Sequence, residues 1–171
     1  NDIQALTRLF EQQGHDICAV MLECIQGESG VHPCTKEFLE AVRNLTKEHG
    51  ALMVCDEVQT GIFRCGTPFG FQHFGVTPDI VTMAKGIAGG MPMGACAAPA
   101  HIAKAYQPGD HGTTFGGSCL AVAAATATLD TLSNGFQQHV QETGEYMRQQ
   151  LAGVSKVKEV RGVGLMNAID L

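Results

Sequence analysis

Basic residues are scarce in this sequence. Its 171 residues include 11 lysines and arginines against 17 aspartates and glutamates, which leaves a formal net charge of −6. No cluster of lysine and arginine interrupts this acidic balance. Because proteins bind nucleic acid nonspecifically through basic surfaces, the composition argues against that activity, and we expect no nucleic-acid partner.

Long apolar runs are also missing. The most apolar stretch of the last third, residues 120–132, is interrupted by Thr126, Thr128 and Asp130. A helix that crosses a bilayer needs about 20 consecutive apolar residues, and the first residues lack the pattern of a signal peptide. We therefore expect a soluble, cytoplasmic protein with no membrane contact.

Paired metal and nucleotide motifs are absent as well. The seven cysteines are odd in number and scattered, with no Cys-x-x-Cys, which is typical of reduced thiols that pack as small apolar residues in a cytosolic protein. No histidine stands at ligand spacing from a cysteine pair and no His-Glu-x-x-His occurs, so we expect no metal site. The Walker and Gly-x-Gly-x-x-Gly patterns are missing too.

What is present is enough apolar material for a core, because 44% of the residues are hydrophobic and 16% are charged. Short apolar runs alternate with longer helical periods, a pattern that indicates an α/β fold. The first apolar run, residues 17–22, is too short for a helix and is expected to be a buried strand. The predicted strands cover 17–22, 51–55, 80–84, 94–98 and short pieces of 157–171, and the predicted helices cover 36–49, 118–132 and 136–152.

Two of the predicted strands end on a charged side chain, Asp56 in one case and Lys85 in the other. In open α/β sheets, ligands bind beyond the carboxyl ends of the strands. A single charge at a strand end is commonly a solvated loop residue, but two in one sheet favour a binding site there.

Lys85 suits covalent chemistry. A partly desolvated lysine amine can form a Schiff base with an aldehyde, and the small residues of 86–90 let the backbone approach a bound ring. Pyridoxal chemistry also needs a carboxylate against the pyridine nitrogen, for which Asp56 is the candidate. Gln59 can offer an amide to the ring's phenolic oxygen, and residues 111–118 can offer hydroxyls and backbone N–H groups to a phosphate.

Four ordered segments resemble the signatures of the class III aminotransferases, and the similarity runs through essentially the whole chain. They are Glu-Cys-Ile-Gln-Gly-Glu-Ser-Gly at 23–30, Asp-Glu-Val-Gln-Thr-Gly at 56–61, Thr-Met-Ala-Lys-Gly at 82–86 and His-Gly-Thr-Thr-Phe-Gly-Gly at 111–117. Within that class the last segment is most similar to the acetylornithine aminotransferases and less similar to the 4-aminobutyrate enzymes.

The resemblance implies pyridoxal 5'-phosphate as the cofactor. It implies that Lys85 links covalently to the cofactor and shuttles the proton, that Asp56 pairs with the ring nitrogen, that Val58 packs on the ring and that Gln59 bonds its oxygen. It also implies that Thr114 reaches the phosphate of a neighbouring subunit, so that a homodimer shares its active sites.

For the substrate, the resemblance implies that Glu28 stands in the pocket, where it can pair with a cation. Glu23 matches a supporting acidic position, and a solvated charge at a strand end is an equal alternative. For Arg64 we expect a structural salt bridge, and for Arg161 a structural role in a small C-terminal domain.

The implied fold is the aspartate-aminotransferase type (fold type I), three-layered with a mainly parallel sheet. Residues 1–135 would belong to its cofactor-binding large domain, and residues 136–171 to a linking helix and the beginning of a small α+β domain. Members of the class are much longer. The chain is therefore expected to be a fragment that lacks a Gly-Thr-rich phosphate loop, a ring-stacking aromatic residue and a carboxylate-binding arginine.

The implied reaction moves an amino group from N-acetylornithine, or a similar ω-amine, to 2-oxoglutarate in arginine metabolism. An ornithine, succinylornithine or 4-aminobutyrate aminotransferase is the alternative within the same chemistry. A non-catalytic binding module is the alternative from another class.

Overall fold

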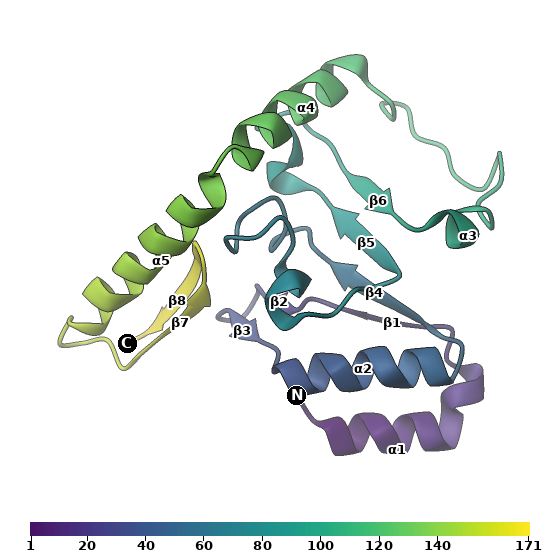
Figure 1. Ribbon diagram of the computed structural model, residues 1–171, viewed down its shortest axis with the longest axis horizontal. Coiled ribbons are helices and arrows are strands. Elements are labelled where there is room, and N and C mark those ends of the chain that lie inside the picture. The colour runs from purple at the N-terminus through teal and green to yellow at the C-terminus, as the bar shows by residue number, and fades with distance from the viewer.

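The computed structural model describes residues 1–171 and is built on a four-stranded sheet in the order β1-β4-β5-β6 (Figure 1). Strands β1 (Ala19–Leu22), β4 (Leu52–Asp56) and β5 (Ile80–Met83) are parallel, and β6 (Ala95–Ala97) runs antiparallel to β5. A parallel partner needs a crossover of a dozen or more residues, usually a helix. The connection from β5 to β6 contains only the short helix η3 (Lys85–Ala88), and the strand reverses. The predicted α/β fold with a mainly parallel sheet is confirmed.

Helices cover one face of this sheet. Helix α2 (Lys36–Glu48) packs on β1 and β4, and α1 (Ile3–Gln13) packs on α2 in the lower part of Figure 1. The predicted N-cap of α2 is confirmed, since the Thr35 hydroxyl accepts from the Phe38 N–H at 3.2 Å. Helix α1, which begins after the Asp2 cap, was not predicted from the sequence.

The remaining elements surround the strand ends. Helix α4 (Cys119–Ser133) and helix α5 (Phe136–Ala152) form a long bent arm that ends beside the antiparallel pair β7 (Glu159–Val163) and β8 (Met166–Asp170) (Figure 1). The bend lies at Gly135, whose φ of +85° favours glycine. The shorter elements are β2 (Ile25–Gln26), β3 (His32–Pro33), α3 (Ala100–Ala103), η1 (Gly14–Asp16) and η2 (Gly70–Phe74).

The core is divided, and only 29 of 171 residues are buried. The largest cluster joins α2 to β4 through Leu39, Val42 and Met53, a second joins β2 to β8, and a third lies under α4. The prediction of a buried first strand is wrong. Strand β1 is the edge of the sheet, and its Met21 is 61% exposed.

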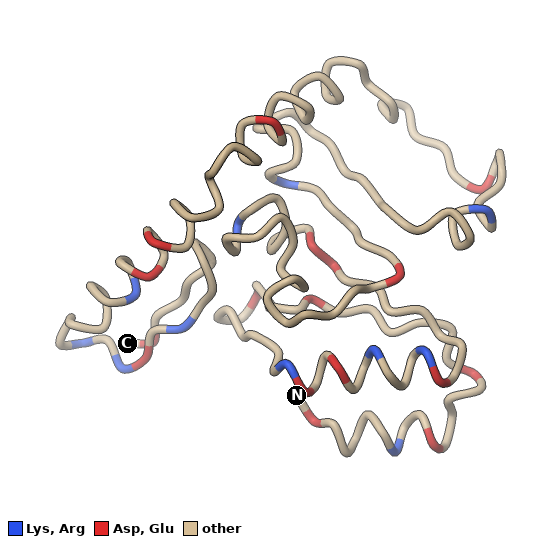
Figure 2. Tube along the Cα trace, viewed as in Figure 1, with Lys and Arg blue, Asp and Glu red and all other residues tan.

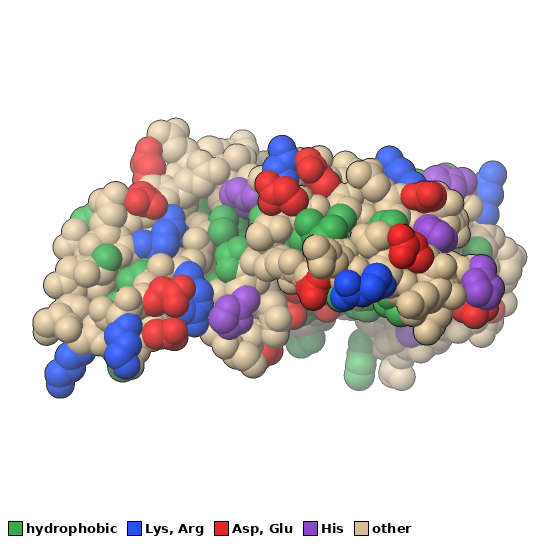
Figure 3. Space-filling view, turned by 90° about the horizontal axis from the view of Figure 1, so that it is seen from below, with side chains coloured by type: hydrophobic (Ala, Val, Ile, Leu, Met, Phe, Trp, Pro, Cys, Tyr) green, Lys and Arg blue, Asp and Glu red, His purple; other side chains and the backbone are tan.

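Charge is spread over the chain rather than gathered. Figure 2 shows acidic and basic residues alternating along α1 and α2, with few charges on the strands. The face seen in Figure 3 likewise mixes both signs, with no patch of one kind. None of the helices has the length and apolar character that a membrane span requires.

Candidate active site

A pocket of about 350 Å³ lies at the carboxyl ends of β4 and β5. Its walls come from the β2–β3 turn, from the loops after β4 and β5, and from the tight turn between β7 and β8. The lining residues are Gly27, Val31, Val58, Gln59, Gly61, Ile62, Arg64, Lys85, Gly86, Leu165, Met166 and Asn167. Segments far apart in the sequence therefore meet around Lys85.

Lys85 follows the last residues of β5 and begins η3 with a left-handed φ of +47°. Its neighbours Ile87 and Ala88 are buried against α4, so the backbone of η3 is anchored while the lysine itself faces the pocket. Lys85 is exposed at the open side of the pocket.

Three residues that line the pocket have a left-handed backbone conformation, which residues other than glycine rarely adopt. Val31 has a φ of +55°, Ile62 of +53° and Lys85 of +47°. For β-branched residues such as Val31 and Ile62 this conformation costs free energy, and such strain gathers at functional sites. The clustering of the three around one pocket supports a functional role for it.

Asp56 ends β4 and is the register partner of Thr82 on β5. Its Oδ1 accepts hydrogen bonds from the Val58 N–H at 3.0 Å and from the Thr82 hydroxyl at 3.1 Å. Its Oδ2 makes no hydrogen bond within the chain. One carboxylate oxygen is therefore fixed and the other is available to a protonated ring nitrogen, which fits the expected use of this residue.

Gln59 and Glu28 meet at the rim of the pocket. The Gln59 Nε2 donates to Glu28 Oε1 at 3.2 Å. Gln59 lines the pocket together with Val58, and Glu28 stands exposed beside it. The structure thus brings the predicted residues Lys85, Val58, Gln59 and Glu28 together, with Asp56 two residues before the first lining residue of its loop, Val58.

Glu57 is a functional support that the sequence analysis missed. It is 1% exposed, and its carboxylate accepts from the Thr60 hydroxyl at 2.6 Å, the Gly70 N–H at 2.7 Å and the Phe71 N–H at 2.9 Å. These bonds secure the loop that carries Ile62 and Arg64. A signal was present, since successive residues at the end of a strand point to opposite faces, so an acidic pair there places one carboxylate inward.

The expected salt bridge of Arg64 is wrong. Its guanidinium forms no ion pair within the chain, while its backbone is held by the Leu165 N–H, which donates to the Arg64 carbonyl at 3.0 Å. This contact with the β7–β8 turn and the turn at Gly61–Arg64 place the side chain along the pocket wall. The pocket therefore carries a second cationic group, able to pair with an anion.

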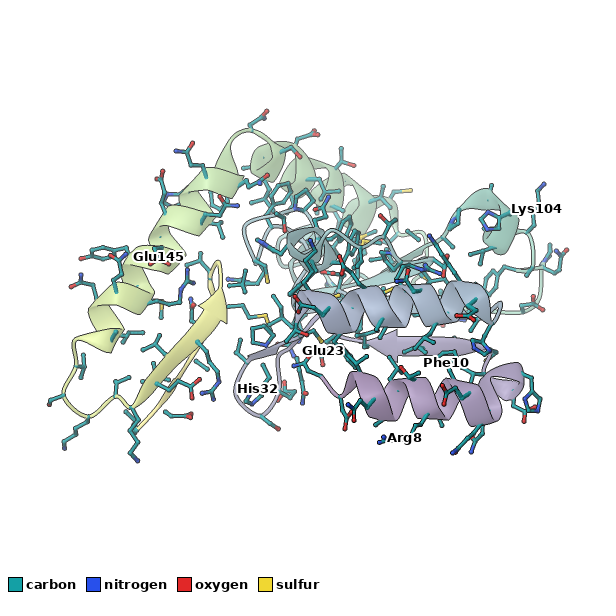
Figure 4. All side chains as sticks on the ribbon, turned by 60° about the horizontal axis from the view of Figure 1, so that its bottom comes forward. Arg8, Phe10, Glu23, His32, Lys104 and Glu145 are labelled. Carbon is teal, nitrogen blue, oxygen red and sulfur yellow. The ribbon has the colours of Figure 1, made fainter.

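Arg161 has the structural role expected of it. It pairs with Glu159 and Asp170 at 3.0 Å each, and its Nε donates to the Gly30 carbonyl at 2.7 Å. It thereby ties β7 and β8 to the loop between β2 and β3. Glu23, labelled in Figure 4, lies between β1 and β2 and outside the pocket, and its Oε2 accepts from the Gly27 N–H at 3.0 Å.

The loop before α4 does not reach Lys85 within this chain. Thr114 and the residues around it are exposed, and residues on either side of Thr114 border a separate hollow between the loop, residues 92–94 and the start of α4. Thr114 is therefore not part of the Lys85 pocket. Its expected contact with the phosphate in a neighbouring subunit stays a prediction.

All seven cysteines are free thiols. Cys24, Cys55 and Cys65 are fully buried and pack in the core as expected, whereas Cys18, Cys96 and Cys119 are exposed. Burial raises the pKa of the Cys65 thiol to about 12. The Cys24 pKa is also raised, by its hydrogen bond to Cys55 at 3.4 Å and by burial.

The sequence and the fold of the chain have counterparts among known proteins. The family model for class-III aminotransferases matches residues 1–171. An acetylornithine aminotransferase of Corynebacterium efficiens is 51% identical over 170 residues, which cover 99% of this chain and 42% of that protein.

Solved structures agree. The acetylornithine aminotransferase of Elizabethkingia anophelis superimposes with a TM-score of 0.92 at 38% identity, covering 98% of this chain and 43% of that one. A Toxoplasma gondii ornithine aminotransferase, described with partial occupancy of PLP at its active site, gives a TM-score of 0.91 at 32% identity, covering 99% of this chain and 41% of its own. The chain thus spans less than half the length of these relatives.

Proposed function

The chain belongs to the class-III aminotransferase family, and from this premise we propose that it forms the cofactor-binding part of an aminotransferase that moves an amino group from N-acetylornithine to 2-oxoglutarate. The observation that carries the proposal is the position of Lys85, which faces a pocket at the sheet edge where Asp56 also ends its strand. Pyridoxal phosphate, when bound, supplies the electron sink for this chemistry.

Several residues of the chain would hold pyridoxal phosphate, each through a different contact. The Lys85 amine would provide the covalent attachment and, once released when the substrate amine takes its place, would take and return the proton at the substrate carbon next to the transferred nitrogen. The free oxygen of Asp56 keeps the ring nitrogen protonated. Val58 supplies apolar contact to the ring, and Gln59 donates to its phenolic oxygen. Thr114 would serve the phosphate of a second subunit, in a homodimer with shared sites.

The substrate side of the pocket carries charges of both signs. Glu28 is placed to pair with a substrate cation, and Arg64 with a carboxylate such as those of 2-oxoglutarate. This arrangement suits a reaction whose two substrates present an amine in one half and a second carboxylate in the other. The names of the bacterial relatives support N-acetylornithine as the amine, and with it a role in arginine biosynthesis. The acidic, scattered-thiol composition supports a cytoplasmic location.

Within this proposal, residues 1–135 form the large domain and residues 136–171 the linking helix and the beginning of a small domain. The packing of α5 on β7 and β8 supports that division. Ornithine is the second candidate amine, favoured by the structural likeness to the Toxoplasma ornithine enzyme. Succinylornithine and 4-aminobutyrate complete the amines to be compared.

Titration with pyridoxal phosphate tests the cofactor assignment. We expect a visible absorbance band from the bound cofactor that is lost in Lys85→Ala and retained in Lys104→Ala, a matched change of an exposed lysine on the far side of the molecule (Figure 4). If the band develops neither in the unmodified protein nor in Lys104→Ala, the chain is a binding module without this chemistry. Initial rates of the full-length enzyme that contains this chain then rank the four amines, and N-acetylornithine should have the highest kcat/KM.

A further inference from the structure

The side-chain amide of Gln59 lies in a cradle formed by two consecutive residues of the β2–β3 turn. A methyl group placed on Gly27 would lie 2.6–2.7 Å from Oε1, Cδ and Nε2 of Gln59, so the amide rests directly on the Gly27 backbone. The Glu28 carboxylate accepts from the same amide at 3.2 Å. Only glycine leaves room for the amide in this position.

The cradle selects one orientation of the amide. A carboxylate accepts hydrogen bonds and donates none, so Glu28 attracts Nε2 and repels Oε1. The amide nitrogen carries two N–H groups. One is used by Glu28, and the other remains for an acceptor in the pocket that Gln59 lines with Lys85.

The turn that forms the cradle is itself anchored. Its start is held by Glu23, whose Oε2 accepts from the Gly27 N–H at 3.0 Å, and its end by the Val31 N–H, which donates to the Gly27 carbonyl at 3.4 Å. Glu23 and His32, labelled in Figure 4, mark the two ends of this segment beside α2. The position of Gly27 relative to Gln59 is therefore set by its own hydrogen bonds.

We propose that Gly27 and Glu28 are positioning residues that hold the Gln59 amide with its nitrogen toward the pocket, so that Gln59 acts as an obligatory donor to an anionic oxygen there. The proposal rests on the proposed function for the identity of that oxygen, the phenolic oxygen of pyridoxal phosphate. Neither positioning residue needs to touch the cofactor. Their effect passes through Gln59.

The pH dependence of the bound cofactor's absorbance in the intact protein tests this role. A donated hydrogen bond favours the anionic form of the oxygen, so its loss should move the midpoint of the colour change to higher pH by about one unit, the size of a hydrogen bond to a charged group. We expect this rise in Gly27→Ala and in Gln59→Ala. The double variant should match Gln59→Ala alone, because the two changes remove the same bond.

Two comparisons keep this test specific. Gly94→Ala is the matched control, because a methyl group there meets only the Met83 carbonyl at an ordinary 3.6 Å, and its midpoint should not move. Glu28→Gln removes a charge as well as the orientation. The midpoint shift caused by Glu28→Gln is therefore measured both in the protein with Gln59 and in Gln59→Ala. The difference between the two shifts is the part of the effect that acts through the orientation of the Gln59 amide. Additive shifts of Gly27→Ala and Gln59→Ala, or an unchanged midpoint in Gly27→Ala, would overturn the proposal.

A cofactor-free measurement separates the cradle from the proposed function. In the NMR spectrum of the protein without cofactor, the Gln59 side-chain amide should exchange slowly with water, and this protection should be lost in Gly27→Ala and Glu28→Gln but kept in Gly94→Ala. If the wild-type protein binds no pyridoxal phosphate, the proposed function fails while this result still decides on the cradle. Equal exchange rates in all four proteins would overturn it.

Discussion

Glu57 and Gly70 are joined by a hydrogen bond of 2.7 Å from the Gly70 N–H to the fully buried Glu57 carboxylate. The contact closes the loop between β4 and η2 on itself, and that loop carries one wall of the Lys85 pocket. The two acidic residues at the end of β4 thus differ, since Glu57 is bonded within the scaffold whereas Asp56 keeps one carboxylate oxygen without a hydrogen bond in the chain.

Replacing Glu57 by glutamine should destabilise the protein. All three groups that contact the carboxylate are donors, and the amide nitrogen of glutamine would face at least one of them without a bond. We expect a loss of about 1–3 kcal/mol in the free energy of unfolding, measured by denaturant titration of the intact protein. Glu11→Gln, an exposed site on α1, should change it little, and equal stabilities of the two variants would contradict the support role.

Replacing Arg64 by glutamine should weaken the binding of anionic substrates. The guanidinium has no partner in the chain and is placed in the pocket wall, so the change removes a charge-assisted bond to the substrate alone. We expect KM for 2-oxoglutarate to rise about tenfold, in steady-state kinetics, with the melting temperature unchanged. Arg8→Gln, at an exposed arginine on α1 (Figure 4), should leave KM unaltered. A lower melting temperature with unchanged KM would instead restore a structural role.

The Arg161–Asp170 pair should give the β7–β8 unit a pH-dependent stability. Hydrogen bonds from Arg161 lower the pKa of the Asp170 carboxyl below its ordinary value of 3.8. A lowered pKa stabilises the fold above 3.8, and this contribution is lost as pH falls through the lowered value. We expect Asp170→Asn to unfold more easily than the wild type at pH 7, with the difference shrinking below pH 3.8. Asp130→Asn on α4 is the control, and a gap that stayed constant with pH would contradict the pairing.

Thiol reactivity should follow burial. The thiolate is the reactive form, and a pKa of about 12 leaves Cys65 almost fully protonated at pH 8. Iodoacetamide at pH 8, followed by peptide mass spectrometry, should therefore modify Cys18, Cys96 and Cys119 and spare Cys65 and Cys24 in the folded protein. All seven should react after denaturation. Rapid labelling of Cys65 in the folded state would show that its cluster opens.

The 171-residue chain by itself should transaminate poorly or not at all. Lys85 is exposed at an open pocket, Thr114 lies outside that pocket, and apolar side chains such as Phe115 and Met21 are 86% and 61% exposed. A rate assay with N-acetylornithine and 2-oxoglutarate on the purified chain, with Lys85→Ala as the blank, checks this. Turnover clearly above the blank would contradict it.

Much of the fold could be predicted from the sequence, because these elements are determined by residues close to one another in the chain. Strands β4 and β5 are short apolar runs that end on a charge, and α2 begins at a threonine cap, so each could be placed within a residue or two. Helix α1 and the exposed state of β1 were missed. The structure and burial of amphipathic segments and edge strands depend on which elements pack against them. The sequence of the segment itself does not identify those elements.

The candidate site shows the same division. The residue types of Asp56, Gln59 and Lys85 suggested pyridoxal phosphate chemistry only weakly, and the family resemblance of the ordered motifs made the predicted site specific. The unpaired state of Arg64 and the hydrogen-bond partners of the buried Glu57 carboxylate were not predictable, because each depends on contacts with residues distant in sequence, Leu165 in one case and Gly70 in the other.

Lys85 was identified from the sequence alone, as a lysine after an apolar strand in a recognisable order of motifs. Only the tertiary structure decided what surrounds it, namely a left-handed backbone, the Gly27–Glu28 cradle behind Gln59 and the β7–β8 turn across the pocket. The physical reason is the separation along the chain between the residues that interact. Caps, apolar periods and strand ends are set by neighbours in the chain, whereas a pocket is set by which distant segments meet, and that is determined when the whole chain packs.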